Sequence, residues 1–456
     1  MRTIFKIIIT LIISGLFFIS CKEELNKIVG GFSVPKTTEE KKELLADLNK
    51  KTEKEPNNME AWNRKGILLF ALARNDEALT AFQKALEINP NLDLNWYNKG
   101  HMESQLGKRE EAINSYNEAI RINPNYYEAY YGRGVVLSEL GRNSEAIRSY
   151  EDAIRNYPDF DSAWGNKGIL LAALGKYDEA LFAYNKALLI NPKFVFAYYN
   201  KGLLLAELNQ FDEALTCYRH AVKNEPNFEL AWYNMGILLS NLGRYEEAIY
   251  AYDKAIALNP KNEQNWNNKG SVLTYMGKYN EAINCFLKAS EINPNHDKAW
   301  YNLGNIYLSQ NKPDEAYETY KKAISLNPNN DYAWNNLGTV YRELGKIDEA
   351  MNNFKKATEL NPQNDKAWQN LAIGFFKMNK FNQSLNCLDK ILELFPNDAG
   401  TYYFKARIYS LQKYKEKALA SLEKAFELAP QYKERAKTDK YLDNIRDESK
   451  FKKMLQ

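Results

Sequence analysis

The stretch that decides the fold is residues 263–296, EQNWNNKGSVLTYMGKYNEAINCFLKASEINPNH. In this 34-residue unit, Trp266, Gly270, Ala282 and Pro294 stand at positions 4, 8, 20 and 32. The same spacing continues outward in both directions without an insertion or deletion. Twelve of the 14 prolines lie on this grid, at positions 56, 90, 124, 158, 192, 226, 260, 294, 328, 362, 396 and 430. A period this regular indicates one repeated structural unit rather than a set of separate domains.

Each unit is predicted to form two antiparallel helices. Position 8 is Gly in nine units and Ala in the last two, and position 20 is Ala in ten units, with Ser384 as the exception. Small side chains at these positions allow two helix backbones to approach closely. Position 15 is Gly or Asn in nine units, and both residues tolerate the left-handed conformation that ends a helix. The second helix then opens with acidic residues and ends before the proline at position 32.

The combined pattern, W-x₂-[KL]-G-x₂-[LY] followed by A, [FY], A and P at positions 20, 24, 27 and 32, resembles the tetratricopeptide repeat. Eleven units, covering residues 59–432, match it in register. The resemblance implies an all-α fold, a right-handed superhelical solenoid of antiparallel helix pairs. It also implies that the protein binds other proteins or extended peptides.

The segments on either side of the repeats are expected to cap the solenoid. Residues 38–58 are predicted to form an N-terminal capping helix, because Thr37 and Glu40 have the spacing of a capping box. Residues 433–456 carry apolar residues among charges, and we expect them to form one C-terminal capping helix.

The first 21 residues have the pattern of an export signal. Basic residues precede an uncharged run of 14 residues, from Ile7 to Ser20, whereas spanning a bilayer takes about 20. The run ends Phe18-Ile19-Ser20-Cys21, which resembles the lipobox of bacterial lipoproteins, although Leu is usual where Phe18 stands. The alternatives are an ordinary signal peptide with an incidental cysteine, or a retained transmembrane helix.

By this resemblance, residues 1–20 are a signal peptide and Cys21 is the lipidation site. Several acyl chains would anchor the protein stably. Residues 21–37, which contain Gly30, Gly31 and Pro35, are expected to form a flexible tether after the acylated cysteine. The predicted location is therefore the bacterial cell envelope, with the protein exported and lipid-anchored at the periplasmic face or the cell surface.

Composition and motifs argue against several classes of function. The 61 Lys and Arg nearly balance the 58 Asp and Glu, and this net charge of +3 gives no reason to expect a nucleic-acid partner. Only three His are present, and C-x-x-C, G-x-x-x-x-G-K-[ST], H-E-x-x-H and G-x-S-x-G motifs are missing. We therefore expect no enzyme activity, metal, cofactor or small-molecule substrate. Cys217, Cys285 and Cys387 share position 23, where other units hold small residues, and are predicted to be packing residues.

The candidate binding site is the concave groove, which positions 2, 5, 6, 9, 12 and 13 of the first helix line in proteins of the resembled family. In units 4 to 8, these thirty positions hold only two charges, Glu207 and Lys298, whereas the overall charged fraction of 26% predicts about eight. The predicted groove residues are amides and aromatics: Asn166, Asn200, Asn234, Asn268, Asn302, Asn336, Asn370, Asn305, Tyr199, Tyr233 and Tyr301, with Tyr275, Asn267 and Asn241 beside them.

The asparagines at position 6 admit two interpretations. An amide both donates and accepts, so a row of them could bind the backbone of an extended peptide whatever its sequence. This arrangement resembles the asparagine ladder in the repeat arm of eukaryotic O-linked glycosyltransferases. Alternatively, the amides bond locally between helices. A carboxylate clamp like that of Hsp90-binding repeats is incomplete, because Tyr301 and Asn370 stand where a Lys and an Arg are needed.

Three hypotheses of function follow. The first is a lipid-anchored interaction module that holds polypeptides in the uncharged groove. The second is a structural scaffold in an envelope assembly, pilus or secretion complex, using its convex face or edges. The third is a substrate-delivering arm for a glycosyltransferase or another enzyme acting in trans.

Overall fold

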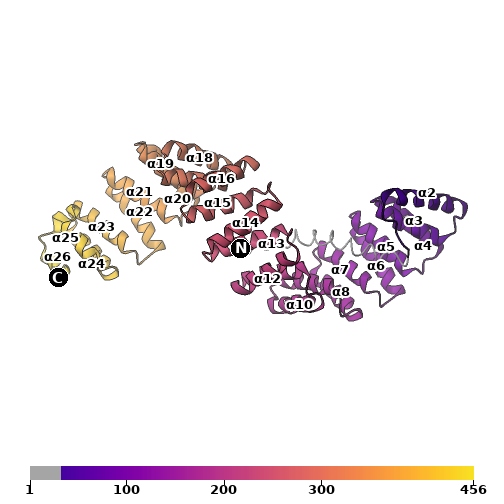
Figure 1. The fold of residues 1–456 in the computed structure, drawn as a ribbon. Coiled ribbons are helices and arrows are strands. Elements are labelled where there is room, and N and C mark those ends of the chain that lie inside the picture. Colours follow the sequence, from indigo (N-terminus) through magenta and orange to yellow (C-terminus); the bar gives the residue numbers. More distant parts are fainter. Residues whose placement is uncertain (1–31) are drawn as a thin grey trace. The chain divides into compact units, whose positions relative to one another are not determined.

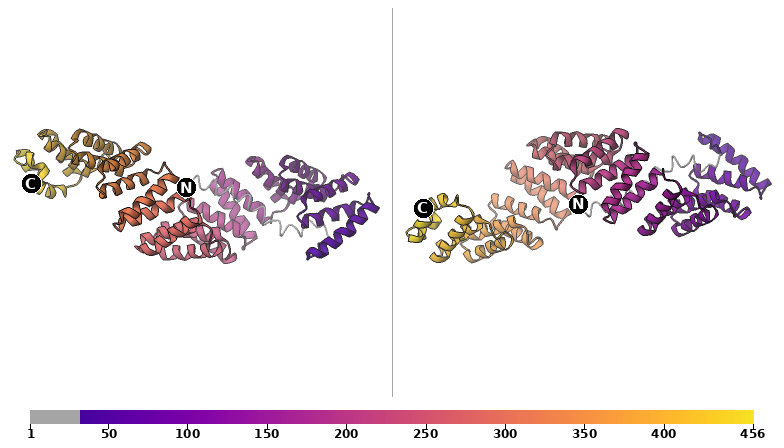
Figure 2. Two further views of the ribbon diagram at one scale, coloured as in Figure 1. Left: turned by 90° about the horizontal axis from the view of Figure 1, so that it is seen from above. Right: turned by 90° about the horizontal axis from the view of Figure 1, so that it is seen from below.

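The computed structural model describes residues 32–456, so the predicted signal peptide and Cys21 lie outside the described residues. Between residues 32 and 456 the chain is helical and contains no β-strand. Within these residues the chain forms two compact units, residues 32–238 and residues 239–456. Figures 1 and 2 show the helices of each unit stacked in pairs.

The helices alternate between the first and second helix of each repeat. The first unit contains α2 (Thr38–Lys54), α3 (Met59–Ala71), α4 (Asn75–Ile88), α5 (Asp93–Gln105), α6 (Arg109–Ile122), α7 (Tyr127–Glu139), α8 (Asn143–Asn156), α9 (Asp161–Ala173), α10 (Tyr177–Ile190), α11 (Val195–Glu207) and α12 (Phe211–Asn224). Helix α13 (Glu229–Asn241) spans the boundary between the units. The second unit continues with α14 (Tyr245–Leu258), α15 (Glu263–Tyr275), α16 (Tyr279–Ile292), α17 (Asp297–Ser309), α18 (Pro313–Leu326), α19 (Asp331–Glu343), α20 (Ile347–Leu360), α21 (Asp365–Lys377), α22 (Phe381–Leu394), α23 (Ala399–Leu411) and α24 (Lys415–Leu428).

The small residues predicted to allow close helix packing lie at the centre of each pair. A Cβ atom built on Gly270 of α15 would lie 2.8 Å from the ring of Phe286 on α16, so any larger residue would displace that ring. Gly277, between α15 and α16, has a φ of +75°. Asn209, between α11 and α12, has a φ of +60°. The predicted left-handed ends of the first helices are therefore confirmed at these positions.

The tryptophans at position 4 connect consecutive repeats. The indole N–H of Trp266 donates to the backbone carbonyl of Pro260, which stands at position 32 of the preceding repeat. All eight tryptophans make this bond, at 2.8 to 3.2 Å. The hydrogen bond explains why Trp recurs at position 4; its acceptor is a backbone carbonyl, so the bond does not itself require the proline.

The two ends of the repeat array differ in how well the sequence predicts them. The capping box of α2 is present, because the Thr37 hydroxyl and the Glu40 carboxylate each accept a backbone N–H of the other residue at 3.2 Å. The expectation of one closing helix over residues 433–456 is wrong. Three short segments form instead: α25 (Tyr432–Thr438), the 3₁₀ helix η1 (Lys440–Ile445) and α26 (Ser449–Met454).

Asp439 explains why the closing segment breaks. Its backbone is extended, with φ −71° and ψ 111°, and its carboxylate accepts the backbone N–H of Tyr441 as the N-cap of η1. The same carboxylate accepts the hydroxyl of Tyr403 at 2.9 Å. The turn lets Leu442, Ile445 and Phe451 pack together against the last repeat, which one straight helix would not allow.

Candidate functional site

First helices of neighbouring repeats contact one another in each unit. Helix α9 contacts α11 in the first unit, and α15 contacts α17, which contacts α19, in the second. We call the side of the stack on which the first helices of consecutive repeats meet its inner side. We call the residues at positions 2, 5, 6, 9, 12 and 13 of these helices the inner face, considered separately in each unit.

Tyr199, predicted to line the groove, is instead a core residue. Its side chain is 0% exposed. The ring packs edge-on against Phe228, with centroids 5.0 Å apart, and also lies against Tyr218. Its hydroxyl accepts a hydrogen bond from Asn234, and burial raises the pKa of Tyr199 well above its ordinary value. A large ring at position 5 fills the space between one repeat and the next, so Tyr199 does not face a ligand in this conformation.

The asparagine row joins consecutive repeats. In four repeats, the amide nitrogen at position 6 donates to the side chain at position 5 of the preceding repeat. The bonds run from Asn166 to Tyr131 at 3.0 Å, Asn234 to Tyr199 at 3.0 Å, Asn302 to Asn267 at 3.1 Å and Asn370 to Asn335 at 2.9 Å. The local interpretation of the asparagines is therefore correct for these donors, because close packing of the first helices brings positions 5 and 6 within hydrogen-bond distance.

The remaining predicted asparagines also have partners within the fold. Asn336 donates to Asn305 at 2.9 Å, and Asn305 accepts the hydroxyl of Tyr320 at 2.7 Å as well. Asn200 is buried and donates to the carbonyl of Phe196 at 2.8 Å. The amide oxygen of Asn268 accepts from its neighbour Asn267. These bonds use much of the hydrogen-bonding capacity on which a peptide-binding ladder would depend.

Some polar groups of the inner face are left for a partner. Within residues 32–456, the side-chain oxygens of Asn166, Asn234 and Asn302 accept no hydrogen bond. Tyr233 and Tyr301 are half-buried, and burial raises the pKa of Tyr301. The inner face therefore offers acceptors and partly covered phenol rings rather than a complete row of free amides.

The most exposed apolar surface of the inner face lies in the second unit. Tyr275 at position 13 is 75% exposed, and Tyr332 at position 2 is 52% exposed. Ile373 at position 9 of α21 is exposed as well. Tyr275 is among the predicted groove residues, whereas Tyr332 and Ile373 lie in units 9 and 10, beyond the units whose inner positions were counted. Applying the same position rule to units 9 and 10 would have found them.

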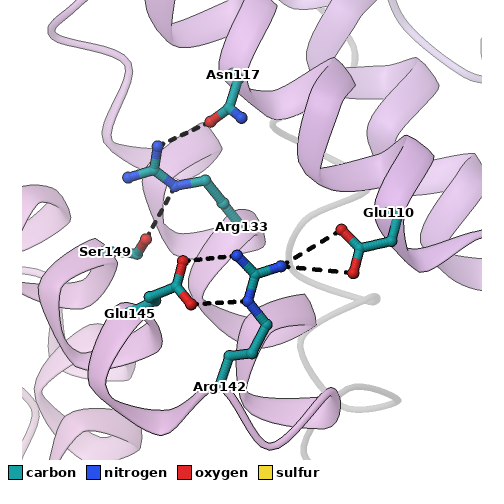
Figure 3. A network of polar contacts seen from close by, with 6 residues as sticks. All are labelled: Glu110, Asn117, Arg133, Arg142, Glu145 and Ser149. Atoms are coloured by element: carbon teal, nitrogen blue, oxygen red, sulfur yellow. Dashed lines mark hydrogen bonds and ion pairs between the residues drawn. The ribbon is translucent and has the colours of Figure 1, made fainter.

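The basic residues of repeat 3 join neighbouring helices. Figure 3 shows Arg133 of α7 donating to Asn117 of α6 and to Ser149 of α8, each at 2.9 Å. In the same view, Arg142 donates to Glu145 at 2.6 and 2.8 Å and forms an ion pair with Glu110 at 3.4 Å. These guanidinium groups already have partners, so they do not form a free basic patch.

The described part of the chain brings together no metal-binding cluster. Across residues 32–456, no group of three or more His, Cys, Asp or Glu is placed to hold a metal ion. Cys217, Cys285 and Cys387 are buried free thiols, as predicted for packing residues, and burial raises the pKa of Cys285 and of Cys387 to about 11. Along the same residues, none of the helices has both the length and the apolar character needed to cross a bilayer.

Comparison with known families places these repeats. Tetratricopeptide repeat models match residues 60–92, 100–141, 127–160, 162–194, 195–228, 230–262, 341–408 and 399–432. A model of the C-terminal domain of cilia and flagella-associated protein 70 matches residues 264–374. The chain belongs to the tetratricopeptide repeat family, and it is an all-α solenoid of antiparallel helix pairs. Repeats of this family bind proteins and peptides, so the chain is a protein-protein interaction module.

Several solved structures are similar to parts of the chain. The crystal structure of MamA is 28% identical, covers 36% of this chain and 96% of its own, and gives a TM-score of 0.34. YrrB, described as a tetratricopeptide repeat protein with an unusual peptide-binding site, is 25% identical over 40% of this chain and 95% of its own, with a TM-score of 0.34. A tetratricopeptide repeat protein from Parabacteroides merdae is 21% identical over 55% and 98%, with a TM-score of 0.42. No curated protein sequence matches significantly.

Proposed function

We propose that this protein is an exported, lipid-anchored module that holds polypeptide partners against the inner face of its repeats. The observation that carries the proposal is the exposure of large apolar side chains there, chiefly Tyr275 and Tyr332. Neither side chain contributes to the core, and exposed aromatic residues are typical anchors of protein interfaces. The inner positions of units 4 to 8, which hold only two charges, favour partners bound through their backbone and apolar side chains rather than through charge.

The sequence around Cys21 supports the lipid anchor. A short apolar run that ends in Ser20-Cys21 follows the basic start of the chain, as in bacterial lipoproteins. An anchored module would act at a membrane surface of the cell envelope, where it could hold exported chains during their assembly or transfer.

Site-specific photo-crosslinking of the full chain in native membranes tests the inner face. A benzophenone amino acid replaces Tyr275, and a matched probe replaces Lys254, which lies exposed on the second helix α14. We expect polypeptide adducts at position 275 and few at position 254, identified by mass spectrometry. Equal labelling of both positions, or adducts at 254 alone, would contradict binding at the inner face.

A second candidate function, the envelope scaffold, is favoured by one feature of the first unit. On the second helix α10, Leu189 is 75% exposed and Phe182 is 55% exposed, with Trp164 packed edge-on against Phe182. This apolar area belongs to the outer side of the stack. A third benzophenone probe at Leu189 distinguishes the two functions, because a single defined partner captured there, with no adduct at Tyr275, would favour the scaffold.

A further inference from the structure

A pocket of about 550 Å³ lies in repeat 10, within the second unit. Asp365 and Gln369 of α21 form one wall, and Ile391 and Leu394 at the end of α22 form another. Phe395 and Asp398, in the connection to α23, complete it. Gln369 stands at position 5 of its repeat, so the pocket opens beside the inner face.

In five other repeats, a hydrogen bond spans the corresponding place. The amide nitrogen of an asparagine at position 31 donates to the carboxylate at position 1 of the same repeat. Five such bonds form: Asn123 to Asp93 at 2.8 Å, Asn191 to Asp161 at 2.6 Å, Asn293 to Glu263 at 3.2 Å, Asn327 to Asp297 at 2.8 Å and Asn361 to Asp331 at 2.9 Å. The bond ties the start of the first helix to the end of the second and satisfies the carboxylate.

Repeat 10 keeps the carboxylate but lacks its donor. Position 1 is Asp365, whereas position 31 is Phe395, which cannot donate and is 50% exposed. Within residues 32–456, the Asp365 carboxylate accepts no hydrogen bond and forms no ion pair, unlike Asp398, which accepts the backbone N–H of Thr401 at 2.8 Å. One unpaired acceptor therefore stands beside an exposed phenyl ring and the side chains of Ile391 and Leu394.

This combination has the chemistry that recognises an arginine side chain. A guanidinium group stacks on an aromatic face and bonds a carboxylate through two parallel N–H groups, while its alkyl stem packs on apolar side chains. We propose that the pocket binds an arginine side chain of the polypeptide held along the inner face, with Asp365 as the charge partner and Phe395 as the stacking surface. The identity of the partner as a polypeptide rests on the proposed function, whereas the pocket can be tested alone.

The test uses the full chain with ¹³C-labelled Ile and Leu methyl groups, titrated with Nα-acetyl-arginine methylamide. The methyl resonances of Ile391 and Leu394 report binding. We expect saturable shifts, with affinity reduced at least tenfold in Asp365→Asn, which removes the charge but keeps the shape. Phe395→Asn should weaken binding as strongly, because it restores the asparagine donor of the other repeats.

Controls separate charge loss and misfolding from loss of the site. Asp297→Asn removes the same charge from a repeat whose carboxylate already has its asparagine partner, and it should leave the shifts at Ile391 and Leu394 unchanged. Methyl resonances of distant repeats confirm that each variant is folded. Equal binding by the norleucine derivative would show that the pocket is merely apolar. Equal binding by the lysine derivative would show that guanidinium stacking plays no part. Unchanged affinity in Asp365→Asn would show that this carboxylate is not the charge partner. Any of these outcomes overturns the proposal.

Failure of this inference is distinguishable from failure of the proposed function. If Asp365→Asn abolishes arginine binding while adducts at Tyr275 are missing, the pocket exists but the inner face is not the polypeptide site. If adducts at Tyr275 persist and the arginine derivative does not bind, the inner face stands and the pocket is wrong.

Discussion

At the scale of single residues, the asparagines of position 6 show how one side chain can suit two roles. Their spacing fits a peptide-binding ladder as well as it fits bonds between repeats. In the fold, Asn302 donates to the buried Asn267, and Asn370 donates to the buried Asn335. These donors stabilise the junctions between repeats, so alanine substitutions at position 6 test stability as well as binding.

We predict that Asn302→Ala loosens the junction between α15 and α17. The substitution leaves the buried side-chain oxygen of Asn267 without its donor, which should lower the free energy of unfolding by about 1 to 3 kcal/mol. Hydrogen exchange of α15 and α17 should become faster, whereas Asn295→Ala, at an exposed loop position, serves as the control. Unchanged exchange in both helices would mean that the bond contributes nothing to the junction.

The buried thiols permit a prediction about reactivity. With its pKa raised to about 11, Cys285 or Cys387 would be roughly 0.1% thiolate at pH 8, and burial limits access further. In the folded chain, both should react with a thiol reagent far more slowly than after unfolding in urea. The rate should rise as the pH approaches 11, because the thiolate fraction rises. Rapid labelling of the folded protein at pH 8 would contradict this packing.

At the scale of elements, the array is held by contacts that recur with the repeat: the glycine at position 8 against the ring at position 24, and the indole N–H against the proline carbonyl. The C-terminal segment follows no repeat, and its structure depends on Asp439. This carboxylate accepts the Tyr403 hydroxyl at 2.9 Å and lies 3.3 Å from the guanidinium of Arg407. It therefore connects η1 to the last repeat.

We predict that Asp439→Ala releases η1 and α26 from repeat 11. The variant loses the N-cap of η1, and it leaves the largely buried side chain of Arg407 without its ion-pair partner. We expect the free energy of local unfolding of this segment to fall by about 2 to 4 kcal/mol. Hydrogen exchange should increase in α23, α24 and η1, while α15 and α16 remain protected. Asp443→Ala, on the exposed side of η1, provides the comparison. A variant with an unaltered exchange pattern would show that apolar packing alone holds the segment.

At the scale of the whole molecule, two sets of residues suggest how the protein works: an apolar signal ending at Cys21, and repeats that expose Tyr275 and Tyr332 on their inner face. The first would fix the protein to a membrane. The second would present a surface to partners near that membrane. The two proposals are independent, since each can fail while the other stands.

We predict that Cys21→Ser moves the protein from the membrane fraction to the soluble fraction and abolishes incorporation of an alkyne-labelled fatty acid. Acylation requires the cysteine thiol, and the acyl chains supply the membrane affinity. Cys217→Ser, which alters a buried packing residue, should change neither readout. A Cys21→Ser protein that still fractionates with membranes and carries the label would contradict lipidation at this position.

The sequence by itself determined the repeat, the positions of the helix ends and the scarcity of charge at the middle inner positions, because the period of 34 residues places the same side chains at the same points of every helix pair. The tertiary structure alone decided that Tyr199 is buried, that the asparagines bond between repeats, that residues 433–456 break at Asp439, and that Asp365 lacks the partner its counterparts have. These features depend on distances between side chains that are far apart along the chain, and packing sets those distances, whereas spacing along the chain specifies only the face on which each residue lies.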